Sequence, residues 1–277
     1  MQASAIKRSL AANFLGVAVA ALAALGVMLP GSAQAQRGGD EYFPSSVWQA
    51  GGGVVVAPRF EGSNRYQTIA FPIVAPAGFG TGDGFVQVRG VDDVRFRLLR
   101  LQGFEFGAVA GYRMGRDSSD SVKLARFADV DGGVVLGGFA GYRFGNTLLS
   151  ASYHRQVSGD DTGAAVRLMA EQTMRLDKST KLVAAIGTNI ADKDYMQTFF
   201  GVTAAQAGPV PVYSASAGFK DVFGSLAATI DLDRQWTLYL VGQYSRLVGA
   251  AANSPIIDTS NQFYGGAGLT FKFDLGR

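Results

Sequence analysis

The sequence predicts a transmembrane antiparallel β-barrel of about twelve strands, with ten as the alternative, which follows a cleaved signal peptide. Three observations lead to this fold class. The only apolar run long enough to cross a bilayer as a helix lies at the N-terminus. The rest of the chain alternates apolar and polar residues with a period of two. Its connections are alternately short and long, as in outer-membrane barrels.

Residues 1–35 have the layout of a secretory signal peptide. Lys7 and Arg8 supply a positive start, residues 11–29 are mostly apolar, and Ala33-Gln34-Ala35 forms a small-residue cleavage site. We place the cut after Ala35. Residues 36–46 are then a periplasmic lead-in, and residues 47–277 form the barrel as a single domain.

The first six strands are expected at 47–57, 65–76, 84–91, 93–100, 103–113 and 131–144. In the fifth, Phe104 and Phe106 alternate with Glu105, and Arg113 continues the polar face. The pattern is weakest over residues 78–102, which is why ten strands is the alternative.

The last six strands are expected at 147–156, 164–176, 180–191, 213–232, 235–247 and 261–273. The alternation is clearest in the final strand, where Phe263 and Leu269 fall on one face and Gln262 and Thr270 on the other. A soluble β-sandwich would show the same alternation but would turn its apolar face inward.

Two features favour an apolar face that contacts lipid. The connections at 144–147, 177–180 and 231–235 are tight, whereas those at 114–130, 191–212 and 248–260 are long, and the two kinds alternate. Aromatic residues also gather at strand ends, where an interfacial girdle is expected; they are Tyr112, Tyr142, Phe144, Trp236, Tyr244 and Phe273. We therefore expect the long loops to be extracellular and the short turns periplasmic.

Composition excludes several classes of function. The formal net charge of +3 includes two basic residues of the signal peptide and gives no reason to expect nucleic acid as a partner. The chain has no cysteine, so disulfides, thiolate catalysis, thiolate metal sites and a lipidated N-terminal cysteine are ruled out. We expect no cofactor.

The polar face of the strands is rich in arginine. These residues are expected to point into the lumen together with a few carboxylates: Arg89, Arg95, Arg97, Arg113, Arg143, Arg167, Arg175, Glu105, Glu171, Asp221 and Asp231. An arginine excess favours anions in an open pore. The alternative is that these charges pair across a filled or loop-plugged lumen.

The connection at 191–212 carries an unusual number of apolar side chains for a loop: Tyr195, Met196, Phe199, Phe200 and Val202. So much apolar surface rarely stays exposed to water. Either the loop folds into the barrel mouth as a plug, or it docks a partner or lipopolysaccharide. Pro209 and Pro211 restrict the chain that returns to the wall and favour inward folding.

Candidate chemical groups are few. Ser152 and the only histidine, His154, share one face of a strand, but no acid is positioned by the sequence to orient the imidazole. Four carboxylates crowd one long loop without the spacing of a calcium-binding loop; they are Asp117, Asp120, Asp129 and Asp131. Lumenal polar residues and solvated loop charges are the simpler readings, and we predict no enzyme.

Several short segments together resemble the MipA/OmpV family of outer-membrane proteins. They are APRFEGS at 57–63, DVDGG at 129–133, YMQTFFGVT at 195–203, YSRL at 244–247, NSPI at 253–256 and NQF at 261–263. The resemblance implies a barrel in contact with outer-membrane lipid and lipopolysaccharide. It also implies a scaffold role that brings a lytic transglycosylase and a bifunctional penicillin-binding protein together in murein synthesis. The chain departs from the family in the four residues that follow Phe273.

The function that this resemblance implies is therefore an outer-membrane scaffold for murein enzymes in a Gram-negative bacterium. A small-solute pore, with a preference for anions, is the alternative, and a barrel hydrolase is a distant third.

Overall fold

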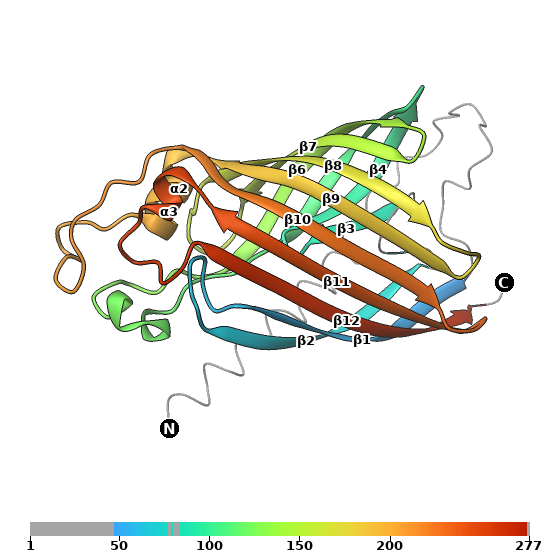
Figure 1. Ribbon diagram of the computed structural model, residues 1–277, viewed down its shortest axis with the longest axis horizontal. Helices are drawn as coiled ribbons and strands as arrows, with labels where there is room; N and C mark the ends of the chain where they lie inside the picture. Colours follow the sequence, from blue (N-terminus) through green and yellow to red (C-terminus); the bar gives the residue numbers. More distant parts are fainter. Residues whose placement is uncertain (1–46, 77–78, 80–83, 276–277) are drawn as a thin grey trace.

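The computed structural model describes residues 47–76, 79 and 84–275, which form one antiparallel sheet of twelve strands that curls into a barrel (Figure 1). The expected signal peptide and lead-in lie outside the described residues. The sheet order is β2-β1-β12-β11-β10-β9-β8-β7-β6-β5-β4-β3, so nearly every strand pairs with its neighbours in sequence. The exception is the pairing of β1 with β12, which brings the first and last strands side by side.

The strands are β1 (Val47–Pro58), β2 (Tyr66–Pro76), β3 (Val86–Gly90), β4 (Asp93–Leu101), β5 (Phe104–Arg113), β6 (Gly133–Phe144), β7 (Thr147–Gln156), β8 (Ala164–Arg175), β9 (Thr180–Ala191), β10 (Gly218–Asp231), β11 (Trp236–Leu247) and β12 (Asn261–Asp274). The helices are η1 (Ser118–Asp120), η2 (Val122–Leu124), α2 (Lys193–Phe200) and α3 (Gly249–Ala252). In the described part of the chain, no helix combines the length and apolar character needed to cross a bilayer.

The predicted twelve strands are confirmed, with one clear error of boundary. The strand expected at 213–232 begins only at Gly218. Upstream of it, Tyr213 forms an isolated β-bridge with Val202, so this stretch belongs to the loop structure over the barrel mouth. The bridge holds Tyr213 within the loop at 192–217, so residues 213–217 do not extend strand β10.

Burial follows the inverted pattern of a membrane barrel. Apolar side chains on the outer face are exposed, for example Ile186 at 69% and Phe263 at 56%. Arg95 and Glu105, on the opposite face of their strands, have no exposed surface. A sandwich would reverse the two faces, and the wall therefore presents a surface suited to lipid.

Most of the residues in the predicted aromatic girdle are exposed on the outer face, but Tyr112 is not. Tyr142, Phe144 and Trp236 are each about 40–50% exposed on the outer face, and Phe104 packs beside Tyr142 with ring centroids 4.8 Å apart. Tyr112 is only 8% exposed because the chain at Gly132 covers its ring. Its assignment to the girdle was wrong.

The two ends of the barrel differ, and Figure 1 shows α2 and α3 at one end and the end of β12 at the other. We call the first the long-loop end; its connections span 59–65, 114–132, 157–163, 192–217 and 248–260. We call the other the short-turn end, where β4–β5, β6–β7, β8–β9 and β10–β11 are joined. In the β4–β5 turn, Gln102 and Gly103 take φ values of 48° and 92°. Because both values are positive, a two-residue turn reverses the chain direction between the strands.

Within the described residues β2 and β3 are the edge strands of the sheet, each with one ladder partner. Pro72 lies in the middle of β2 opposite Gly52 of β1. A proline cannot donate a ladder hydrogen bond, so its presence suits a strand that is paired on one side only.

Candidate functional site: a capped lumen crossed by ion pairs

Four connections at the long-loop end fold over the barrel mouth as one unit, which we call the cap (59–65, 114–132, 192–217 and 248–260). Each contributes at least one side chain to a common buried apolar cluster; its members are Phe60, Leu124, Phe127, Val202, Val210 and Ile256. Leu124 and Ile256 have no exposed surface. The loops are therefore packed together by burial of apolar surface.

Helix α2 places the apolar residues of its loop against the ends of the strands. The carboxylate of Asp192 caps the helix by accepting a 2.8 Å hydrogen bond from the Tyr195 backbone N–H. Tyr195, Met196, Phe199 and Phe200 then fall on one face, and all four are buried.

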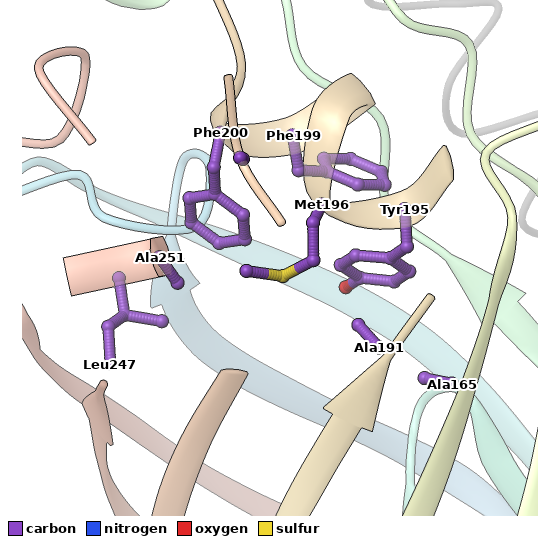
Figure 2. Close-up of a cluster of buried hydrophobic side chains, with 9 residues drawn as sticks. Ala165, Ala191, Tyr195, Met196, Phe199, Phe200, Leu247 and Ala251 are labelled. Carbon is purple, nitrogen blue, oxygen red and sulfur yellow. The ribbon is translucent and has the colours of Figure 1, made fainter. Parts of the chain in front are cut away.

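Figure 2 shows these side chains directed at the wall and at α3. They pack against Ala165, Ala191, Ala215, Leu247 and Ala251. The loop predicted to plug the mouth or to dock a partner thus buries these four side chains within the molecule, over the barrel mouth.

Polar contacts anchor α2 to the lumen below it. The Tyr195 hydroxyl donates to Glu61 at 2.8 Å, and Lys220 on β10 donates to the same carboxylate oxygen at 2.6 Å. The guanidinium of Arg113 stacks on the Tyr195 ring at 4.6 Å. Burial and the neighbouring Glu61 carboxylate raise the pKa of the Tyr195 phenol, so it stays a donor at neutral pH.

Arg116 ties the 114–132 loop to the same helix. Its Nη1 donates to the Phe199 carbonyl at 3.2 Å, and its guanidinium lies 5.1 Å from the centre of the Phe127 ring. Burial lowers the pKa of Arg116 to about 10, which still leaves it charged at neutral pH.

Beneath the cap, a buried network centred on Asp93 joins opposite strands. Asp93, the first residue of β4, accepts from Arg95 Nε at 2.8 Å and from Arg167 Nη1 on β8 at 3.0 Å. Asp92, in the β3–β4 turn, forms a second pair with Arg167 at 3.1 Å. Arg95 also donates to Ser150 on β7. Strands that are not neighbours in the wall are therefore bridged through the lumen.

The same network continues to the cap. Arg167 Nε donates to Asn189 on β9 at 3.0 Å, and Asn189 donates to Asp221 on β10 at 2.7 Å. Asp221 pairs with Lys220 at 3.2 Å, which leads to Glu61 in the cap. A continuous chain of polar contacts thus runs from β4 across β8, β9 and β10 to the cap.

Other predicted lumenal charges lie nearer the short-turn end. Arg89 on β3 and Glu171 on β8 form a buried pair at 2.6 Å across the lumen. Arg143 donates to Glu105 at 2.6 Å. Arg175 falls outside these groups because it is exposed at the end of β8.

Ser152 and His154 do come together. The serine Oγ lies 2.8 Å from His154 Nε2, and Nδ1 lies 3.0 Å from the Asp92 carbonyl oxygen, which accepts when Nδ1 carries the proton. This resembles a nucleophile and base with an orienting acceptor. The two residues are only 2% and 1% exposed, however, and the pair instead fastens the β3–β4 turn to β7.

Three of the four loop carboxylates, Asp117, Asp120 and Asp129, accept hydrogen bonds from backbone N–H groups of their own loop. Asp117 caps η1 by accepting from the Ser119 N–H at 2.7 Å, and Asp129 accepts from the Ser118 N–H at 2.7 Å. The Ser118 hydrogen bonds lower the pKa of Asp129. Among the described residues no group of His, Cys, Asp or Glu has the arrangement of a metal site.

A hollow of about 860 Å³ lies on the barrel wall between β5 and β10. Its lining includes Phe104, Leu149, Ile186 and Val222, which are all exposed on the outer face. These exposed apolar side chains place the hollow on the outer surface of the wall.

Some residues of the network were not predicted from the sequence. Asp92 and Asp93 lie in the stretch where the strand pattern was weakest, and Glu61 and Lys220 were given no role. A carboxylate beside a tight turn is indistinguishable by sequence from an ordinary turn residue. Nothing local marked these four as members of the network.

A family model matches most of the chain, and curated outer membrane proteins resemble part of it. A family model described as MltA-interacting protein MipA matches residues 50–273. Outer membrane protein Omp26La of Vibrio anguillarum is 27% identical over 167 residues, and outer membrane protein OmpV of Vibrio cholerae is 26% identical over 167 residues. Each match covers 59% of this chain and 63% of the relative.

Among solved structures, an outer membrane channel from Pseudomonas putida F1 aligns with 87% of this chain and 100% of its own at 10% identity and a TM-score of 0.39. OmpT of Vibrio cholerae aligns with 83% of this chain and 99% of its own at 8% identity and a TM-score of 0.33.

Proposed function

Because the chain belongs to the MipA family of outer-membrane β-barrel proteins, we propose that it is a closed barrel that acts as a membrane-anchored scaffold for murein enzymes. The observation that carries this proposal is that packed or paired side chains lie both over the barrel mouth and across the lumen. The cap buries its apolar side chains over the mouth, and the Asp93 network crosses the interior below it. A barrel closed in this way acts through the surfaces that it presents.

The periplasmic turns are the surfaces that murein enzymes reach if the short-turn end faces the periplasm. The β8–β9 turn exposes Asp177 and Lys178, and the β10–β11 turn exposes Asp233 and Arg234. These turns are small, so contact with them alone gives weak or transient association. The proposed partners are a lytic transglycosylase and a penicillin-binding protein.

An anion-preferring pore is the second candidate, and the arginine-rich lumen favours it. Arg95, Arg97 and Arg143 all face inward on the described strands. For ions to pass, both the cap and the Asp93 network have to move aside. The scaffold needs no such change, which is why we prefer it.

Capture from envelope extracts tests the scaffold. We expect the purified, tagged barrel to retain a lytic transglycosylase, and we expect reversal of the charges at Asp177, Lys178, Asp231 and Arg234 to weaken retention. The matched control reverses Lys193 and Asp194, which are exposed at the other end. Equal loss in both variants, or no capture by the unaltered barrel, would count against the proposal.

A further inference from the structure

A bulge in β4 brings two arginines to the same side of the wall. The register of β4 against β5 shifts between Arg97 and Leu99. In a regular strand residues 97 and 100 would face opposite sides, because their separation is odd. The extra residue resets the alternation, so Arg97 and Arg100 both approach Glu105 on β5. Bulges commonly redirect side chains in this way at functional sites.

The resulting group contains three guanidinium groups around one carboxylate. Arg143 Nε on β6 donates to Glu105 Oε1 at 2.6 Å, while Arg100 Nε and Arg97 Nη1 lie 3.7 and 3.8 Å from the same oxygen. The carboxylate is fully buried, and the side chains of Arg97 and Arg143 are 9% and 6% exposed. All four residues lie close to the β4–β5 and β6–β7 turns.

Arg97 is the arginine of this group whose hydrogen bonding is incomplete. Among the described residues, its Nε and Nη1 are buried without a hydrogen-bond partner, and so is Oε2 of Glu105. A buried guanidinium that lacks hydrogen bonds is costly, and native structures seldom leave one unsatisfied. Its contact with Glu105 is too long for a hydrogen bond, and the shared oxygen is already engaged by Arg143.

We propose that Arg97, Arg100 and Arg143 form a binding site for a soluble phosphate-type oxyanion at the short-turn end of the lumen. Guanidinium groups match phosphate oxygens by directional, charge-assisted hydrogen bonds. A bound oxyanion would accept from the unsatisfied donors of Arg97 and would replace a long ion pair by direct contacts. Phosphate carries several acceptor oxygens in a tetrahedral array, which suits three guanidiniums that approach from two strands.

The site is accessible from solvent, and it already contains a carboxylate, Glu105, that competes with an incoming anion for the guanidinium groups. The side chain of Arg100 is 33% exposed, so an anion reaches the group from its side. Glu105 repels an incoming anion and occupies the guanidinium of Arg143. Removing its charge should therefore tighten anion binding, which is opposite to the result expected if Glu105 were only a structural partner of the arginines.

Calorimetric titration of the full barrel in a phosphate-free detergent tests the site, with inorganic phosphate as the probe and chloride at equal ionic strength as the reference. We expect saturable phosphate binding. Arg97→Gln should weaken it by about tenfold or more, the effect of losing a charge-assisted hydrogen bond, and Glu105→Gln should strengthen it. Arg175→Gln removes an exposed arginine elsewhere in the barrel and should change nothing.

Folding of each variant is checked by heat-modifiable migration in gels, and if Arg97→Gln does not fold, Arg100→Gln and Glu105→Gln carry the test. Dioleoylphosphatidic acid added to the micelles should compete poorly if the ligand is soluble. The proposal is overturned if phosphate binds no better than chloride. It is also overturned if Glu105→Gln fails to tighten binding, or if only the lipid phosphate binds.

Discussion

Individual residues show how this barrel tolerates charge in its interior. Asp93 accepts from two guanidiniums, and Arg167 donates to three different side chains. Buried charges are acceptable when they are paired and their hydrogen bonds are satisfied, whereas removing one partner leaves the other uncompensated. The network therefore holds the β3–β4 turn in the lumen as long as all its members are present.

On the outer surface of the wall, by contrast, side chains must be apolar, because no partner there neutralises a charge in contact with lipid. Leu226 on β10 is 51% exposed and points away from the lumen. We expect Leu226→Arg to cost about 2–4 kcal/mol if the position lies near the bilayer midplane. Unfolding by denaturant in lipid vesicles measures this cost. Val122→Arg is the control, since Val122 is 83% exposed in a loop and should change little. Equal stability of Leu226→Arg and the unaltered protein would show that this face does not contact lipid.

A single carboxylate organises the β8–β9 turn. Asp177 Oδ1 accepts from Ser179 Oγ and N at 2.8 and 2.7 Å and from the Thr180 N–H at 2.8 Å. The Ser179 hydrogen bonds lower the pKa of Asp177 below its usual 3.8. Its contribution to turn stability is therefore present above that unfolded value and is lost as pH falls through the lower, folded value.

We accordingly expect the Ser179 and Thr180 amides to exchange slowly at pH 5 and to lose protection only when the pH falls well below 3.8, after correction for intrinsic rates. Amide hydrogen exchange measures this. Asp177→Asn keeps an acceptor without a titrating group and should remove the pH dependence. A carboxyl pKa at or above 3.8, measured by NMR for Asp177, would contradict the account.

At the scale of elements, the strands could be predicted from the sequence and the cap could not. Alternation of residues such as Phe263 and Gln262 gives each strand its lipid and lumen faces, because the period of two is local. The α2 residues were recognised only as apolar surface that needs cover. Their contacts with Leu247 and Ala251 join segments about 50 residues apart, and no local pattern encodes such contacts.

In the lumen, too, residues that follow the local alternation could be predicted, whereas those at turns and bulges could not. The alternation identified Arg95, Arg113 and Glu105 as inward residues, and all three are buried. It did not identify Asp93, because the turn beside it interrupts the pattern. The bulge in β4 was also invisible, since an inserted residue such as Leu98 looks like any other apolar strand residue.

The orientation of the elements in the membrane follows from loop length. We expect single cysteines at Ser119 and Asn253, both exposed at the long-loop end, to react on intact cells with a membrane-impermeant maleimide. A cysteine at Lys178, exposed in a short turn, should react only after the cells are permeabilised. The natural chain has no cysteine, so the background is zero. The reverse labelling pattern would mean that the short-turn end faces the cell exterior. The short turns could then not dock periplasmic enzymes.

For the whole molecule, closure is the property on which the scaffold depends. The cap covers the long-loop end through the two apolar clusters that contain Phe200 and Ile256. Below it, the polar contacts that run from Arg95 to Glu61 cross the lumen. An oxyanion site near the opposite end is compatible with a closed lumen, because binding there does not require passage.

Conductance in planar bilayers tests closure most directly. The purified protein should insert, as judged by protease protection in matched vesicles, and should give no steady channel openings in potassium chloride at either polarity. A porin prepared in the same detergent serves as the positive control. Long-lived, anion-selective openings of the unaltered protein would contradict the closed barrel and would favour the pore.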